Sequence, residues 1–125
     1  LSMALAAGLG ASHATVLSMA AKSVTMPIAI GLTEKLGGVA SLTSALVMLT
    51  GILGGAITQP MLALMRIREP YITGFTLGTV AHGIGTARAL QGGAEMGAFA
   101  GLAMGLAGLL TAVLVPVCLK LVGLF

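Results

Sequence analysis

The sequence predicts an all-α integral membrane protein. Of its 125 residues, 58% are hydrophobic and 7% are charged, whereas a soluble globular domain carries roughly 25% charged residues. So few charges cannot cover the surface of a soluble fold of this size. The apolar residues also form long unbroken runs, which are typical of membrane-spanning helices and differ from the alternating segments of about ten residues in transmembrane β-barrels.

The first third of the chain predicts two short helices around a polar break. Ser12 is in position to cap a helix that runs to about Ala21. Thr25 takes the N-cap position of the second helix, because Pro27 is tolerated in the first turn of a helix but not in its interior. This second helix should end at Leu36, before a pair of glycines.

Residues 39–65 form an apolar run that is long enough for one transmembrane helix, since a span needs about 20 residues. Gly51 and Gly55 are four positions apart and share one helix face, which predicts close contact with another helix. Pro60 should bend or fray the end of this span. The charged segment 66–70 then predicts a loop at a membrane face, and its arginines favour the cytoplasmic face.

Residues 71–91 contain the stretch Gly78-Thr-Val-Ala-His-Gly-Ile-Gly-Thr-Ala-Arg88, which organises the second half of the chain. Its glycines disfavour an uninterrupted helix and predict a break. It also places His82 and Arg88 in otherwise apolar sequence. Titratable groups at membrane depth are costly, so this stretch is a candidate functional site.

Residues 95–125 predict the last span. Gly97, Gly101 and Gly105 recur at every fourth position of this span, which removes side-chain bulk from one face and favours close approach of a second helix. Cys118 is the one cysteine of the chain, so neither an intrachain disulfide nor a cysteine metal site is possible, and we expect it to be a packing residue.

A shift of 56 residues superimposes the landmarks of the two halves of the chain. The shift places Ser23 on Thr79, Ile28 on Ile84, Gly37 on Gly93, Met48 on Met104, and Pro60 on Pro116. Each repeat, about 12–64 and about 68–120, is then a broken helical segment followed by a full transmembrane helix. Interrupted apolar segments at corresponding positions of two repeats indicate the binding site of a secondary transporter.

The relative orientation of the repeats depends on whether the broken segments cross the membrane. About 25 residues provide either one span or two arms of roughly 18 Å, at 1.5 Å per residue. Re-entrant segments would make the repeats inverted, whereas spanning segments would make them parallel. We expect broken, partly re-entrant segments and inverted repeats.

Polar side chains at the two breaks form the predicted site for a small anion. His82 is suited to hydrogen-bond a carboxylate or relay a proton, and its alternative is a neutral ring that bonds a backbone carbonyl. Arg88 is suited to bidentate carboxylate binding, unless it extends to the interface near Glu95. Lys22 would neutralise the anion or anchor the chain at the interface. The remaining predicted site residues supply hydroxyl groups or open backbone: Ser23, Thr25, Thr79, Thr86, Gly83 and Gly85.

The hydroxyl groups are equally suited to cap half-helices. The two roles are compatible, because a capped helix N-terminus carries the positive end of the helix dipole and attracts an anion.

The sequence gives no support to several other functions. The chain has no Asp and three Glu, so a Ser/His/acid triad lacks a credible acid at membrane depth. No pair of histidines has the spacing of a helical metal site, and the six basic residues are scattered, without the basic run of a nucleic-acid-binding protein. We expect no enzymatic activity, no catalytic residues, no metal, no cofactor and no nucleic-acid partner.

Three stretches of the sequence resemble the LrgB/CidB family. They are Lys22-Ser-Val-Thr-Met-Pro-Ile-Ala29, Gly78-Thr-Val-Ala-His-Gly-Ile-Gly-Thr-Ala-Arg-Ala89 and Gly97-Ala-Phe-Ala-Gly-Leu-Ala-Met-Gly105. The family includes bacterial antiholin-like proteins and the C-terminal portion of the plastid glycolate/glycerate translocator. The resemblance extends over essentially all 125 residues and corresponds to roughly the C-terminal half of a family member. Two positions depart from the family: Ala21 replaces a frequent proline, and Met26 replaces a frequent threonine.

The resemblance implies one of two functions. The first is transport of small monocarboxylates such as glycolate or glycerate, and the alternative is holin-like or antiholin-like control of murein hydrolase export and cell lysis. It implies a multi-pass protein of the bacterial inner (plasma) membrane. The expected partners are the lipid bilayer, a small anionic substrate, further copies of the chain, and an N-terminal half that lies outside this single transmembrane domain, 1–125.

Overall fold

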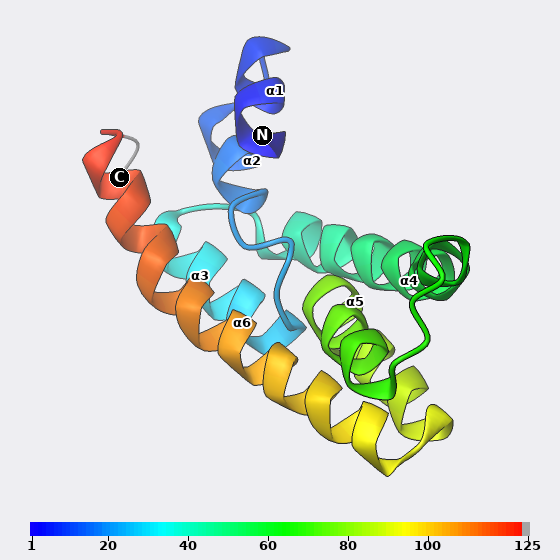
Figure 1. Ribbon diagram of the computed structural model, residues 1–125. Coiled ribbons are helices and arrows are strands. Elements are labelled where there is room, and N and C mark those ends of the chain that lie inside the picture. Colours follow the sequence, from blue (N-terminus) through cyan, green and yellow to red (C-terminus); the bar gives the residue numbers. More distant parts are fainter. Residues whose placement is uncertain (124–125) are drawn as a thin grey trace.

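The computed structural model describes residues 1–123 and confirms the all-α prediction for them. Six helices make up this part of the chain (Figure 1). In chain order they are α1 (Ser2–Gly8), α2 (His13–Ser18), α3 (Met26–Leu36), α4 (Ala40–Leu64), α5 (Pro70–Gly92) and α6 (Ala94–Leu121). The last predicted span extends beyond this description at residues 124–125.

The boundaries of the two short helices follow the local chemistry that predicted them. Ser12 is the N-cap of α2, and its hydroxyl accepts a hydrogen bond from the backbone N–H of Thr15 at 3.3 Å. Thr25 is the N-cap of α3, with Pro27 in the first turn. α3 ends at Gly37, which takes the left-handed conformation at φ 79° and ψ 22°. α2 ends at Ser18 and not at about Ala21 as predicted, so the break between the two helices covers residues 19–25.

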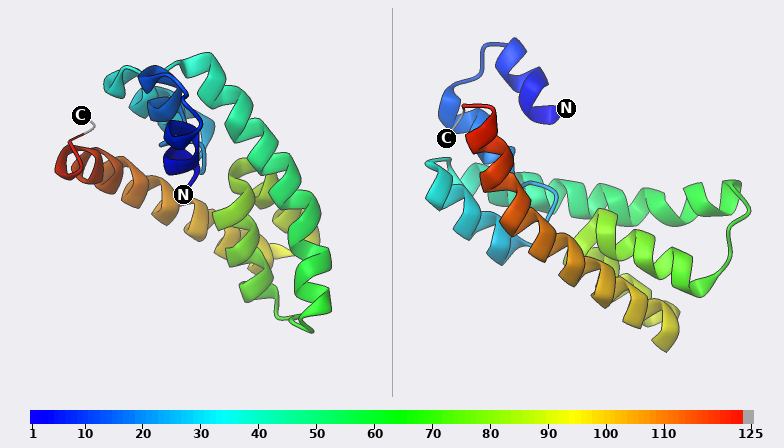
Figure 2. Two further views of the ribbon diagram at one scale, coloured as in Figure 1. Left: turned by 90° about the horizontal axis from the view of Figure 1, so that it is seen from above. Right: turned by 60° about the vertical axis from the view of Figure 1, so that its left-hand side comes forward.

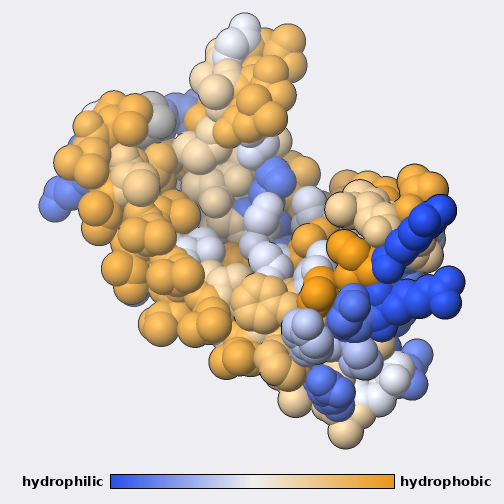
Figure 3. Space-filling model, viewed as in Figure 1, coloured by the Kyte–Doolittle hydropathy of each residue, from blue (hydrophilic) through white to orange (hydrophobic). Residues whose placement is uncertain are grey.

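α4 and α6 are the two helices of the described chain that are long and apolar enough to cross a membrane. They contain 25 and 28 residues, with mean hydropathies of 1.8 and 2.3 over their most apolar windows. Only 22% and 17% of those windows are buried inside the chain, so most of their apolar side chains face outward. Figure 3 shows hydrophobic residues along α6 and hydrophilic residues gathered where α4 passes into α5.

The shorter elements α3 and α5 lie between the two long helices (Figures 1 and 2). α3 and α5 each contact both α4 and α6, whereas no Cα atom of α4 lies within 8 Å of a Cα atom of α6 in residues 1–123. A core of Leu17, Val24, Leu32, Leu36, Val47 and Leu119 joins α2, α3, α4 and α6. α5 lies outside this core and packs between α4 and α6.

The predicted break in residues 71–91 is present, and it lies on the histidine. α5 consists of two helical arms that meet at His82, whose backbone has φ 48° and ψ −125°. The neighbouring Gly83 and Gly85 were expected to supply the unusual backbone, but neither of them has a positive φ. The strained residue is thus a non-glycine residue, for which positive φ is uncommon.

The two arms of α5 fold back against each other. A Cβ atom added to Gly85 would overlap the backbone carbonyl oxygen of Leu77, although residues eight positions apart lie about 12 Å apart along a straight helix. Gly74 in the first arm and Gly92 at the end of the second arm both lie against Met96 of α6. The start of one arm and the end of the other therefore meet at the same level of α6.

Two glycines of α5 bring that helix into backbone contact with α6. A Cβ atom on Gly74 would overlap the carbonyl of Met96, and one on Gly78 would overlap the carbonyl of Ala100. The predicted glycine ladder of α6 is used only in part. Gly97 packs against Leu90, but Gly101 and Gly105 have no atoms within 4 Å of an added Cβ. The close contact therefore depends on glycines of α5, with the α6 backbone opposite them.

The glycine face predicted on α4 is confirmed. Gly51 and Gly55 are buried, and a Cβ atom on Gly51 would lie 3.0 Å from the Ile84 side chain in the second arm of α5. Pro60 lies inside α4, which continues as a helix to Leu64. Gly51 and Gly55, which belong to the first half of the chain, thus pack against α5 next to its break at His82.

A buried group of hydroxyls fastens α2, α3 and α4 to one another. The Ser18 hydroxyl accepts a hydrogen bond from the Val39 backbone N–H at 2.7 Å. The Thr43 hydroxyl donates to the Ser18 carbonyl at 2.9 Å and lies 2.9 Å from the Thr33 hydroxyl. These bonds hold the chain on both sides of the first break, and they satisfy polar groups that would be costly to bury alone.

Candidate functional site

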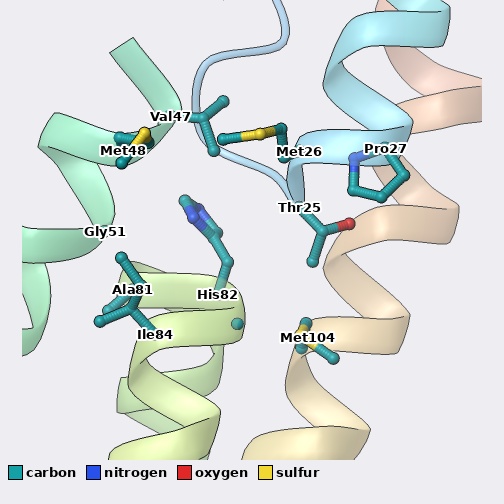
Figure 4. Close-up of a pocket in the computed structure, with 11 residues that line it drawn as sticks. Thr25, Met26, Pro27, Val47, Met48, Gly51, Ala81, His82, Ile84 and Met104 are labelled. Atoms are coloured by element: carbon teal, nitrogen blue, oxygen red, sulfur yellow. The ribbon is translucent and has the colours of Figure 1, made fainter. Parts of the chain in front are cut away.

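A pocket of about 460 Å³ lies where the two breaks meet between the long helices. It is bounded by the N-terminus of α3, the middle of α4, the break in α5, and α6 (Figure 4). The lining residues are Thr25, Met26, Pro27, Val47, Met48, Gly51, Ala81, His82, Gly83, Ile84 and Met104. Residues that are far apart in the sequence and belong to both predicted breaks therefore share one cavity.

The first break contributes a helix N-terminus to this pocket. Thr25 is the N-cap of α3, but its side chain makes no capping hydrogen bond. Because the first N–H groups of a helix have no partner within the helix, this end of α3 carries partial positive charge. The Thr25 hydroxyl and the helix end are both suited to an anionic group in the cavity.

The second break contributes the one buried imidazole of the pocket. The His82 side chain is 3% exposed, and its Nε2 atom has no hydrogen-bond partner within residues 1–123. The ring lies close to the backbone of Ser23 and to the positive charge of Lys22. A buried polar atom without a partner is rare in folded proteins, and it is suited to a ligand that supplies the missing hydrogen bond.

The backbone at His82 is strained, in addition to the unpaired Nε2 atom of its side chain. Non-glycine residues in sparsely populated backbone regions cost about 1–3 kcal/mol and cluster at functional sites. Here the strained conformation turns the chain sharply, so the second arm of α5 begins at Gly83 beside the pocket. The start of this arm adds a second positive helix end to the one at α3.

Several predicted site residues lie outside the lining of this pocket. Arg88 donates a hydrogen bond to the Gly55 carbonyl of α4 at 3.1 Å, which braces the second arm of α5 against α4. The Thr86 hydroxyl donates to the Ala100 carbonyl at 3.5 Å, and the Thr79 hydroxyl donates to the Phe75 carbonyl at 2.8 Å. Gly85 lies against the first arm of α5. Arg88 and Thr86 thus join the second arm of α5 to α4 and α6, whereas the Thr79 hydroxyl bonds within its own helix.

Lys22 and Ser23 lie next to the pocket without lining it. The Lys22 ammonium donates to the Ser23 hydroxyl at 3.2 Å, and the Lys22 carbonyl accepts a hydrogen bond from the Thr50 hydroxyl of α4 at 3.1 Å. The structure therefore brings Thr25, His82 and Gly83 together at the cavity. Lys22 and Ser23 lie near His82 but do not line the cavity.

The apolar wall of the pocket was not predicted from the sequence. Val47, Met48 and Gly51 come from α4, Ile84 from α5, and Met104 from α6. Apolar residues are so frequent in this chain that their type alone carries no site information. One sequence pattern was informative, because the shift of 56 residues pairs Met48 with Met104 and both line the cavity.

The fold and the pocket define a class of protein. The chain is a helical protein with two long, apolar, outward-facing helices that are suited to a membrane. A mostly apolar pocket with two polar side chains, Thr25 and His82, lies at its two helix breaks. No group of three or more His, Cys, Asp or Glu side chains that would hold a metal occurs among residues 1–123. The chain belongs to the LrgB-like family, whose sequence profile matches residues 1–121.

Named relatives support this assignment. The chain is 30% identical over 112 residues to the holin-like protein CidB of Staphylococcus epidermidis, covering 90% of this chain and 49% of that protein. The same values hold for the holin-like protein CidB of Staphylococcus aureus. The uncharacterized protein YwbG of Bacillus subtilis is 35% identical over 103 residues, which cover 82% of this chain and 46% of the relative. The chain thus spans about half the length of these relatives, and no solved structure matches it.

Proposed function

We propose that the chain forms the core of a secondary transporter for small organic anions, with monocarboxylates such as glycolate or glycerate as the substrate class. The observation that carries this proposal is the unpartnered Nε2 atom of His82, buried in a pocket where two helix N-termini meet. One carboxylate would accept hydrogen bonds from the imidazole and the Thr25 hydroxyl, and the helix ends would stabilise its charge. Protonation of His82 would couple transport to protons.

The distribution of pocket residues over the two repeats supports a transporter architecture. The shift of 56 residues relates four pairs of lining residues to each other: Thr25 and Ala81, Met26 and His82, Pro27 and Gly83, and Met48 and Met104. Two-fold related broken helices around one central site are typical of secondary transporters. With the folded-back arms of α5, this pairing favours re-entrant breaks in two inverted repeats.

Uptake into proteoliposomes tests the proposal. We expect the full-length protein to take up a radiolabelled monocarboxylate, and His82→Ala and Thr25→Val to reduce uptake at least about tenfold, since each removes one charge-assisted hydrogen bond of about 1.5–3 kcal/mol. His13→Ala and Thr79→Val are matched controls, because both residues lie outside the pocket. Full uptake by both pocket variants would rule out this site.

The alternative is a holin-like or antiholin-like membrane protein that acts by oligomerisation. Two observations favour it: the relatives named holin-like protein, and the open face of α6 at Gly101 and Gly105. That face would admit a helix of a second copy at close distance. Under this function Gly101→Leu changes the oligomeric state and cell lysis, whereas His82→Ala and Thr25→Val leave both unchanged. The opposite pattern would exclude it.

A further inference from the structure

A groove of about 280 Å³ lies between α3 and α6, which run alongside each other (Figure 1). Small or apolar residues line most of it: Ile28, Gly31 and Leu32 of α3, and Ala112 and Pro116 of α6. A Cβ atom added to Gly31 would meet no atom within 4 Å, so this part of the groove is open space. Lys35 is the one charged residue among the residues that line the groove.

Two lysines lie at the same end of this groove. Ile28, near the start of α3, packs against Gly108 of α6, and Lys35 in the last turn of α3 lines the groove with Pro116. The two helices therefore run in the same direction along the groove. Lys120 lies one turn beyond Pro116 in the last turn of α6, and residues four apart lie on the same face of a helix. Both lysine side chains are exposed.

This arrangement of charge and apolar surface is complementary to a phospholipid. When α6 crosses a bilayer, its last turn reaches a membrane surface, so Lys35 and Lys120 lie at the depth of the lipid headgroups. The apolar part of the groove then lies at the depth of the acyl chains. Lysine ammonium groups bind phosphate, and basic pockets between transmembrane helices bind anionic headgroups. Glu34 precedes Lys35 in the chain but does not line the groove.

We propose that the groove between α3 and α6 binds an anionic phospholipid, with its phosphate at Lys35 and Lys120 and an acyl chain along Gly31 and Ala112. The charge of the two lysines favours this occupant over an apolar helix of a second copy or of the remaining part of the full-length protein. Such a helix would cover the groove and leave the ammonium groups without a counter-charge. The lipid site does not depend on the anion pocket proposed above.

Native mass spectrometry of the purified, delipidated full-length protein tests this site by titration with phosphatidylglycerol or with phosphatidylcholine of the same acyl chains. We expect phosphatidylglycerol to bind at least about fivefold more tightly, since one lysine near an anionic lipid surface contributes a factor of about five. In the double variant Lys35→Gln/Lys120→Gln this preference should fall to within about twofold. Arg68→Gln is the matched control, because Arg68 is an exposed cation outside the groove, and it should retain the preference.

The variant Gly31→Leu tests the apolar part of the groove. The added side chain occupies the open space, so both lipids should bind at least about fourfold more weakly, which corresponds to one methylene group left in water. Gly8→Leu places the same side chain in open space on α1, outside the groove, and should leave lipid binding unchanged.

Three results would overturn the lipid site. The first is equal binding of the two lipids, or a preference that the double lysine variant retains. The second is displacement of phosphatidylglycerol by an equal concentration of inorganic phosphate, with normal binding in Gly31→Leu, because the ligand is then free phosphate. The third is binding of neither lipid, which means that another part of the protein or a second copy covers the groove. Thermal unfolding checks that each variant folds, and Lys120→Gln alone repeats the test if the double variant unfolds.

Discussion

His82 combines three properties that rarely occur in one residue. It is almost fully buried, its Nε2 atom has no partner within residues 1–123, and its backbone takes a conformation that favours glycine. The unsatisfied buried nitrogen and the strained backbone both lower the stability of the chain. These properties support the proposal that His82 binds a ligand.

Replacing His82 with glycine distinguishes the effect of its backbone strain on stability from the effect of its side chain on uptake. We expect His82→Gly to unfold at the same or a higher temperature in detergent, because glycine relieves backbone strain of about 1–3 kcal/mol. The same variant should lose monocarboxylate uptake, because the imidazole is gone. A stable variant with normal uptake would show that the histidine has no role in binding.

Arg88 was predicted to bind the ligand, but its side chain contacts α4 and does not line the pocket. Its guanidinium bonds the Gly55 carbonyl, so Arg88→Met should destabilise the chain by about 1.5–3 kcal/mol while the affinity for a monocarboxylate stays within about twofold. The exposed Arg68 provides the control, and Arg68→Met should change neither quantity. A large loss of affinity in Arg88→Met, measured by titration, would place Arg88 in the binding site after all.

At the scale of the elements, the packing of α5 on α6 determines where the pocket lies. Gly74 and Gly78 allow the α6 backbone to approach α5, and His82 at the end of the first arm of α5 then lies at the cavity. On the other side, Gly51 and Gly55 of α4 pack against the second arm. The break is thus held between two glycine faces.

The two classes of glycine should respond differently to the same substitution. Gly78→Ala introduces a methyl group onto the carbonyl of Ala100, so we expect a loss of about 1–3 kcal/mol and a lower melting temperature. Gly101→Ala introduces the same group into open space and should not lower stability. Thermal melts of the two variants in one detergent give the comparison, and equal melting temperatures would contradict the packing of α5 on α6.

The elements were predictable where local chemistry determines them. Thr25, Pro27 and Gly37 mark the ends of α3 by cap and turn preferences that need no knowledge of the fold. The glycine contacts were not predictable to the same degree, because Gly74–Gly78 and Gly101–Gly105 have the same spacing in sequence. Which pair meets a neighbour depends on the rotation of each helix about its axis, and tertiary packing sets that rotation.

The candidate site was predictable in its location but not in its walls. Glycines near residue 82 indicated a break, and the 56-residue shift paired that break with residues 22–27. The positive φ of His82, the outward placement of Thr79, and the bond from Arg88 to α4 all follow from contacts between helices. No local pattern encodes them.

At the scale of the whole molecule, α4 and α6 face outward with apolar side chains while α3 and α5 fill the space between them. This arrangement places both breaks inside the bundle, where a bilayer would surround the long helices. In the proposed function, Thr25 at the first break and His82 at the second bind the same carboxylate.

A double-mutant cycle between the two breaks tests this most directly, because it measures the coupling free energy between residues 25 and 82 in ligand binding. Titration of the purified protein with a monocarboxylate gives binding free energies for Thr25→Val, His82→Gln, and the double variant. Groups that contact one ligand are coupled by about 0.5–3 kcal/mol, whereas independent sites add within about 0.3–0.5 kcal/mol. We predict a coupling of at least about 0.5 kcal/mol between residues 25 and 82, and additive effects for Thr79→Val with His82→Gln. Additive effects in the first pair would contradict a shared site.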